Sequence, residues 1–140
     1  MSATWGEQRS RTVSWYDPML GADAGRRMAG LDYLRAMRDG ELPGPPIAGL
    51  MRFDLKDVEK GRVSFTCQPD ESAYNPIGVV HGGLVCTLLD SVCGCAVHST
   101  LPLGKGYTSV EIKVSYLKAV RLDSGRLTAC LLYTSDAADE

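Results

Sequence analysis

One helical stretch of the sequence carries a lone carboxylate among apolar residues. Asp90 is the only formally charged side chain between Gly82 and Thr100, and the apolar residues around it fall on almost every side of the predicted helix. Such a helix is buried, and a buried carboxylate is costly unless it is paired or neutralised. Two interpretations stay open. Asp90 is a catalytic group, or it pairs with a buried Lys or Arg or lies at a subunit interface.

The residues directly before this helix favour contact with a carbonyl oxygen. His81, Gly82 and Gly83 would form the helix N-terminus, where backbone N–H groups lack intrahelical partners and the helix dipole is positive. Glycine lets a ligand approach the backbone closely, so a carbonyl placed there would be polarised as in an oxyanion hole. The alternative is a plain junction in which the glycines only form the bend.

Three other polar residues are weaker candidates. Asn75 lies six positions before His81 on a loop with Pro and Gly, where Asn-Pro is also an ordinary turn signal. Thr108 and Ser109 begin the next predicted strand, and a hydroxyl there could hold a water molecule. These residues gain meaning only in combination with Asp90 and the helix N-terminus.

The composition is that of one globular domain without bulk affinity for nucleic acid or membrane. The chain has 140 residues, of which 44% are hydrophobic and 23% charged, and its formal net charge is -2. No apolar run is long enough to span a bilayer, and residues 1–14 lack the apolar core of a signal peptide. We therefore expect a cytoplasmic protein.

The cysteines predict neither a disulfide framework nor a metal site. They are Cys67, Cys86, Cys93, Cys95 and Cys130. They contain no CxxC pair, and the two histidines do not complete a tetrahedral ligand set with them. We expect small buried hydrophobic residues in a reducing compartment, with no metal or cofactor.

The first half of the sequence predicts an arm, a helix and two strands. Residues 1–25 have no clear period and predict a loose N-terminal arm. Apolar side chains at three-residue steps predict a helix over 26–38, which ends at the following Asp-Gly pair. Residues 47–55 are expected to start the sheet, and 62–68 alternate as a strand should.

The second half predicts a loop, the buried helix and two more strands. Residues 69–80 carry turn signals, 82–100 form the helix, and 108–116 and 126–133 have the pattern of strands. This order predicts an α+β domain over residues 26–133, with a sheet packed on one central helix.

The last residues do not continue the strand pattern. Residues 134–140 show no alternation where the sheet should go on, and a sheet that ends here has an open edge. We interpret the chain as cut short, with a foreign tail from about Leu131 and the domain ending at 133. A natural polar tail is the alternative.

Together these features resemble a known family. The motif is Asn75-x-x-Gly78-x-x-His81-Gly82-Gly83, with Asp90 nine residues after the histidine. It resembles the PaaI-like branch of the hotdog-fold acyl-CoA thioesterases. Residues 96–102 and 107–117 also look like that family, and the resemblance runs from about 34 to 127, roughly two thirds of the chain.

The resemblance implies a hotdog fold, in which an antiparallel sheet wraps around a long central helix. It implies a homodimer or homotetramer with sites at the subunit interface. Asp90 would activate water or attack the thioester carbonyl directly, and the Gly82 N–H would polarise that carbonyl. His81 and Asn75 would hold the thioester end, and Ser109 would place the water. In such dimers Asp90 and Ser109 face the Asn75–Gly82 loop of the other subunit.

The resemblance also suggests further substrate-binding residues, on weaker grounds. Gly83 and Thr108 are expected to line the substrate site, and Lys118 and Arg121 to meet the CoA phosphates, although solvated surface charge explains these two as well. Lys105 is weaker still. Members of the family continue with about two more strands, which we expect to be missing here.

The predicted function is hydrolysis of acyl-CoA thioesters that carry an aryl or medium-chain acyl group. The first alternative is a non-catalytic acyl-CoA binding module on the same fold. A hydratase is disfavoured, because Gly94 and Cys95, not His, follow Asp90 at the spacing of the D-x4-H pattern. A purely structural dimer, with Asp90 paired across the interface, also stays open.

Overall fold

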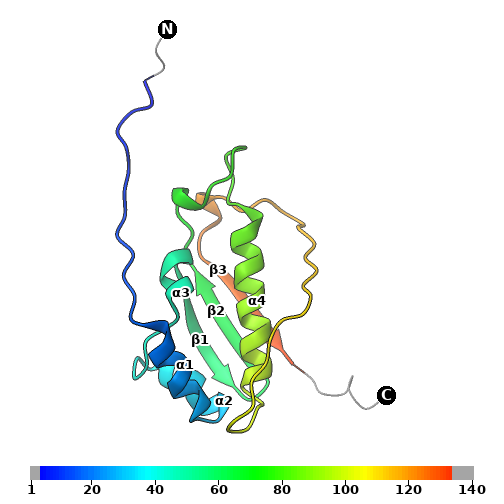
Figure 1. Cartoon of the computed structure of the whole chain (residues 1–140). Helices are drawn as coiled ribbons and strands as arrows, with labels where there is room; N and C mark the ends of the chain where they lie inside the picture. Colours follow the sequence, from blue (N-terminus) through cyan, green and yellow to red (C-terminus); the bar gives the residue numbers. More distant parts are fainter. Residues whose placement is uncertain (1–3, 134–140) are drawn as a thin grey trace.

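A three-stranded sheet packed on one long helix forms the body of the molecule (Figure 1). The structure, a computed structural model, describes residues 4–133. The long helix α4 (Gly82–His98) packs on the sheet, and a group of shorter N-terminal helices lies beside the first strand. The predicted α+β class and central helix are therefore confirmed.

The sheet is antiparallel in the order β1-β2-β3. Its strands are β1 (Phe53–Glu59), β2 (Arg62–Cys67) and β3 (Leu127–Leu132). Gly61 closes the β1–β2 hairpin with φ +77°, a backbone conformation that favours glycine. The strands predicted over 62–68 and 126–133 thus form within one residue of their predicted bounds.

Helix α4 supplies one side of the core and the sheet supplies the other. Leu84, Leu88, Val92 and Ala96 are buried, and they recur at four-residue steps as one face of a helix must. They meet the buried side chains of the first two strands, among them Val58, Val63, Phe65 and Cys67. The core therefore fixes the rotation of α4 about its axis and, with it, the direction in which Asp90 points.

The N-terminal helices differ from the prediction. The helix predicted over 26–38 is α2 (Gly30–Arg38), and a separate helix, α1 (Pro18–Arg26), occupies part of the expected loose arm. Asp17 caps α1, because its side chain accepts the Met19 N–H at 2.9 Å and a proline follows it. The mixed composition of residues 18–26 hid this helix, since it buries no side chain.

The sheet begins later in the chain than predicted. Residues 46–51 form helix α3 (Pro46–Met51), and β1 begins only at Phe53. Proline is tolerated in the first turn of a helix, so the Pro45-Pro46 pair starts α3 instead of preventing it. Arg52 ends the helix in the left-handed conformation, with φ 58°.

Residues 108–116 do not form the predicted strand. Within residues 4–133 the sheet consists of β1, β2 and β3, and 108–116 pairs with none of them. The segment runs past α4 on the side away from α1–α3 (Figure 1), and Val110 is 95% exposed. Alternation predicts that one face of a segment could be buried, but it cannot supply the neighbour that a strand needs.

The cysteines agree only in part with the expected burial. Cys67 is buried, Cys86, Cys93 and Cys95 are half-buried, and Cys130 is exposed. Cys130 lies on the outer face of β3, so its expected burial is wrong. The expectation about the tail concerns residues 134–140, which lie outside the described part of the chain, while Leu131 and Leu132 belong to β3.

Candidate active site

Asp90 lies in the middle of α4 and is half-buried. Its carboxylate Oδ1 accepts a hydrogen bond of 2.6 Å from the hydroxyl of Ser109, nineteen residues further along the chain. Ser109 is itself exposed, so the pair lies at the boundary between the packed helix and solvent. The structure therefore brings together two of the predicted site residues.

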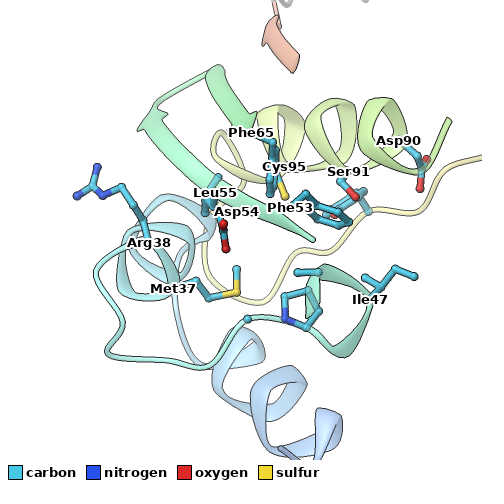
Figure 2. Close-up of a pocket in the computed structure, with 14 residues that line it drawn as sticks. Met37, Arg38, Ile47, Phe53, Asp54, Leu55, Phe65, Asp90, Ser91 and Cys95 are labelled. Atoms are coloured by element: carbon cyan, nitrogen blue, oxygen red, sulfur yellow. The ribbon is translucent and has the colours of Figure 1, made fainter. Parts of the chain in front are cut away.

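An apolar cavity opens beside this carboxylate. It has a volume of about 410 Å³, and Asp90 is one of its lining residues. Most of the wall is apolar and comes from α2, α3 and the first two strands, with Met37, Ile47, Phe53, Leu55 and Phe65 among its residues. Figure 2 shows Asp90 and Ile47 toward one side of the cavity and Met37 toward the other. Such a cavity suits the apolar end of a ligand whose polar end meets Asp90.

His81 and Gly83 form the cap of helix α4. The His81 side chain accepts the Gly83 N–H through Nδ1 at 2.8 Å. Because this bond uses the Gly83 N–H, Gly82 is the better choice for a donor to a substrate carbonyl. Gly83 makes this capping contact, and its expected place in the wall of the substrate site stays a prediction.

Tyr116 is a residue at this helix end that the sequence did not single out. Its hydroxyl donates to the Gly82 carbonyl at 2.9 Å and lies 2.8 Å from the Cys86 Sγ. A side chain at position 82 would meet the Tyr116 ring and hydroxyl at 2.9 Å. In the sequence Tyr116 is only the last residue of the strand predicted over 108–116, a pattern that gave no sign of a contact with Gly82.

Asn75 organises the loop before α4. Its side-chain oxygen accepts the N–H groups of Ile77 at 3.1 Å and Val79 at 3.2 Å. Both contacts use the carbonyl oxygen of the side chain, so the amide N–H groups of Asn75 are not committed by them. The Asn75 side-chain oxygen thus stabilises the turn that the Asn-Pro pair predicted.

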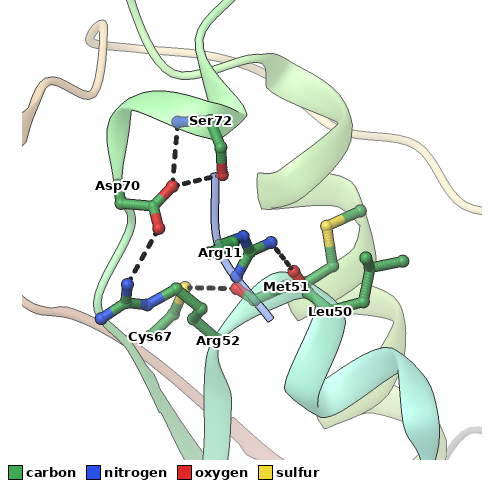
Figure 3. Close-up of polar contacts among 7 residues, drawn as sticks. All are labelled: Arg11, Leu50, Met51, Arg52, Cys67, Asp70 and Ser72. Atoms are coloured by element: carbon green, nitrogen blue, oxygen red, sulfur yellow. Dashed lines mark hydrogen bonds and ion pairs between the residues drawn. The ribbon is translucent and has the colours of Figure 1, made fainter. Parts of the chain in front are cut away.

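A network of polar contacts holds the base of this loop (Figure 3). The Asp70 carboxylate accepts the Ser72 N–H at 2.9 Å and bonds the Arg52 guanidinium at 2.8 Å. The Ser72 hydroxyl also donates to this carboxylate and is the main reason that the pKa of Asp70 lies below its ordinary value, with Arg52 and the Ser72 N–H adding to the effect. Arg11 adds a bond of 2.5 Å to the Leu50 carbonyl, which fastens the N-terminal arm to α3.

Lys118 and Arg121 lie near the N-terminus of α4. The Val120 carbonyl accepts the Val80 N–H at 2.9 Å, so the segment that carries both cations runs beside the residue before His81. Both side chains are exposed. Lys105 instead lines a cavity with Tyr33 and His98 at the far end of the helix, so it does not join this group.

One chain does not bring the two halves of the predicted site together. Eight residues separate Gly82 from Asp90 on α4, which places them about 12 Å apart along the helix axis. A single thioester carbonyl cannot touch both groups across that distance. Asp90 and Ser109 therefore lie together at one place, and Asn75, His81 and Gly82 lie at another.

The Cys93 and Cys95 thiols of α4 are not activated. Burial raises the pKa of Cys95 to about 11, and burial also raises the pKa of the Cys93 thiol. Both therefore carry their protons at neutral pH and are poor nucleophiles. Among the described residues, no three His, Cys, Asp or Glu side chains gather closely enough to hold a metal ion. Asp90 remains the reactive group that the geometry favours.

Known proteins are similar to this chain in sequence and in fold. Residues 77–133 match the family model of the thioesterase superfamily. A candidate thioesterase from Ralstonia eutropha JMP134, described as related to phenylacetic acid degradation, superposes with a TM-score of 0.63 at 27% identity, covering 70% of this chain and 74% of that one. The chain has the hotdog fold.

Two further proteins are similar to this chain. A candidate esterase of Halobacterium salinarum is 42% identical over 83 residues, which cover 54% of this chain and 55% of that protein. The chain thus spans about half the length of the curated relative that it matches. The PaaI protein of Escherichia coli shares the fold, with a TM-score of 0.59, 19% identity and coverage of 74% and 70%. The resemblance to the thioesterases of this superfamily is confirmed.

The described helices do not include one that is both long and apolar enough to cross a membrane.

Proposed function

We propose that this hotdog chain hydrolyses acyl-CoA thioesters to a free acid and CoA, with Asp90 as the general base or nucleophile. The observation that carries the proposal is the position of the Asp90 carboxylate, which is held by Ser109 at the wall of an apolar cavity. The cavity accepts the acyl group, and the carboxylate meets the thioester carbon at its mouth. We place this activity in the cytoplasm.

In the simpler form of the reaction, Asp90 removes a proton from water. The water oxygen then bonds to the carbonyl carbon, the C–S bond breaks, and the CoA sulfur leaves and takes up a proton. Ser109 positions the water or the carboxylate through its hydroxyl, with Thr108 beside it. In the nucleophilic form the Asp90 carboxylate bonds the carbonyl carbon, the C–S bond breaks, and CoA leaves and takes up a proton. Water then hydrolyses the mixed anhydride and releases the acid and the Asp90 carboxylate.

The oxyanion that develops on the thioester needs a donor, and Gly82 at the N-terminus of α4 is the residue we assign. A backbone N–H at a helix start carries partial positive charge and lacks an intrahelical acceptor. His81 and the amide group of Asn75 shape the same end of the site, with Gly83 behind them. We assign the CoA phosphates to Lys118 and Arg121, which flank the backbone contact between Val120 and Val80.

Because Gly82 and Asp90 are about 12 Å apart along one helix, a complete site requires two chains. We propose a homodimer, alone or paired into a tetramer, in which Asp90 and Ser109 of one chain face Gly82 and His81 of the other. This arrangement also accounts for a half-buried carboxylate without a cation beside it in its own helix, since the carboxylate opens onto an interface.

A complementation experiment tests the shared site. Asp90→Asn and His81→Ala are each inactive in this account, but a mixed dimer contains one site with both wild-type residues. Random mixing would then restore about a quarter of the wild-type sites. If the mixture stays as inactive as its components while exchange of subunits is verified by mass, each site belongs to a single chain and the two-chain proposal is wrong.

A further inference from the structure

The cavity beside Asp90 adjoins a second cavity. The second has a volume of about 280 Å³ and lies among α1, α2 and the C-terminal end of α4, with Tyr33, Leu34, Pro46 and His98 in its wall. Five residues line both spaces and form the partition between the two cavities. They are Met37 from α2, Gly44 and Pro45 from the turn before α3, Cys95 from α4 and Tyr107 from the segment after α4. Met37, Cys95 and Tyr107 are the three that lie outside this Gly-Pro turn.

Tyr107 packs directly against α4 because Gly94, the helix residue beneath its ring, has no side chain. A Cβ on Gly94 would lie 2.4 Å from the Tyr107 ring, so glycine at 94 allows the ring to rest directly on the helix. The ring also stacks at a tilt on His98, with 5.3 Å between ring centroids. Met37 closes the partition from the opposite side, as a flexible side chain that fills the remaining gap.

The distance from Asp90 to this partition sets the length of acyl chain that the first cavity can hold. Cys95 is five residues beyond Asp90, or about 7.5 Å along the helix, and His98 is eight residues beyond it, or about 12 Å. An extended chain advances about 1.2 Å per bond, because a peptide residue of three backbone bonds spans about 3.5 Å. The first cavity thus takes about six bonds, and the two together take about ten.

We propose that Met37, Cys95 and Tyr107 determine substrate specificity by closing the acyl cavity, so that the chain prefers short or aromatic acyl groups and excludes longer straight chains. This inference rests on the proposed function. Removing one of the closing side chains joins the two cavities. The second cavity is largely apolar, so a longer acyl chain gains burial there, and each extra methylene group contributes about fourfold in affinity.

The test measures kcat/KM for straight-chain acyl-CoAs of increasing length. Met37→Ala and Tyr107→Ala open the partition, whereas Met37→Leu keeps its bulk. Met19→Ala removes an exposed methionine on α1 and controls for the substitution itself. We expect the wild-type chain to lose activity beyond about six carbons and the two opening variants to gain about tenfold or more on chains of eight to ten carbons. Met37→Leu should retain the wild-type length limit.

Two outcomes separate this inference from the proposed function. If the wild-type chain hydrolyses acyl-CoAs and both opening variants keep its length profile, the partition is wrong and the hydrolase stands. If the wild-type chain hydrolyses none, the hydrolase is wrong, and calorimetry with S-alkyl-CoA thioethers decides the inference instead. Tighter binding of long S-alkyl chains by Met37→Ala than by Met37→Leu supports the partition, and equal binding overturns it. Thermal unfolding of each variant verifies that it is folded.

Discussion

The Ser109 hydroxyl donates a 2.6 Å hydrogen bond to the Asp90 carboxylate, which links the segment after α4 to the centre of that helix. This contact is the main polar tie between residues 107–117 and the candidate catalytic group. It joins the residue that would activate water to one that could hold the water in place.

Ser109→Ala should lower kcat by about tenfold and leave KM nearly unchanged, because a hydrogen bond to a charged group contributes about 1.5–3 kcal/mol and this one is partly exposed to water. Ser109→Thr retains a hydroxyl and should recover most of the rate. Steady-state kinetics on a short-chain acyl-CoA measures both. Equal rates for the alanine and wild-type chains would show that Ser109 has no part in the reaction.

The close approach of α2 to the end of α4 depends on Gly30. A Cβ at this position would lie 1.8 Å from the His98 carbonyl oxygen, which is backbone and cannot move aside. Gly30→Ala should therefore lower the free energy of unfolding by about 3 kcal/mol or prevent folding.

Gly21→Ala is the matched control, since Gly21 lies inside α1 and a Cβ there meets nothing within 4 Å. It should leave stability unchanged or raise it by up to about 1 kcal/mol through helix propensity. Urea unfolding of both variants gives the comparison. Similar stability for the two would mean that α2 does not pack on His98 as described.

Gly94→Ala should lower the free energy of unfolding when residue 107 is tyrosine and raise it when residue 107 is alanine. In the wild-type background the new methyl group would collide with the Tyr107 ring, and we expect a loss of about 1–2 kcal/mol. With Tyr107→Ala the collision is absent, and alanine should stabilise the helix by up to about 1 kcal/mol. A double-mutant cycle measured by urea unfolding tests the contact. Additive effects would argue that Tyr107 does not rest on Gly94.

The Asp70 network predicts a dependence of stability on acid. The bonds from Ser72 and Arg52 lower the pKa of Asp70 below its ordinary value of 3.8, so the folded state favours the charged carboxylate. The stability gained is fully present above pH 3.8 and is lost as the pH falls through the lowered folded value. Asp70→Asn should remove it.

Thermal unfolding from neutral to strongly acidic pH tests this dependence. The difference in stability between wild type and Asp70→Asn should be constant at neutral pH and shrink below pH 3.8. Asp123→Asn, at an exposed carboxylate in a short turn, serves as the control. A difference that keeps its size into strong acid would mean that the Asp70 carboxylate is not stabilised by these bonds.

The sequence was informative where a pattern and a local signal coincided. The apolar surroundings of Asp90 predicted a buried helix, and Gly82 to His98 forms it. The motif around His81 and Gly82 predicted a helix N-terminus, and His81 caps it. In both cases the signal is local, because helix propensity, capping and periodicity act over a few residues.

Periodicity and local signals in the sequence could not predict contacts between distant segments. Tyr116 meets Gly82 across 34 positions, and nothing in the sequence indicated this contact. Ser109 meets Asp90 across 19 positions, and this pairing was expected only from the family resemblance, because the spacing itself carries no period. The strand predicted over 108–116 failed for the same reason, since alternation describes one segment while a ladder requires two. Helix α3 was missed because residues 47–55 were expected to start the sheet, although Pro45 and Pro46 suit the first turn of a helix.

The release of free thiol from a panel of acyl-CoAs, compared between the wild-type chain and Asp90→Asn, tests the central claim most directly. The substitution keeps the shape of the side chain and its hydrogen bond with Ser109, but it removes the base. The account predicts turnover by the wild type and a loss of at least about a hundredfold in kcat for the variant. Equal release of thiol by both chains would contradict the assignment of Asp90.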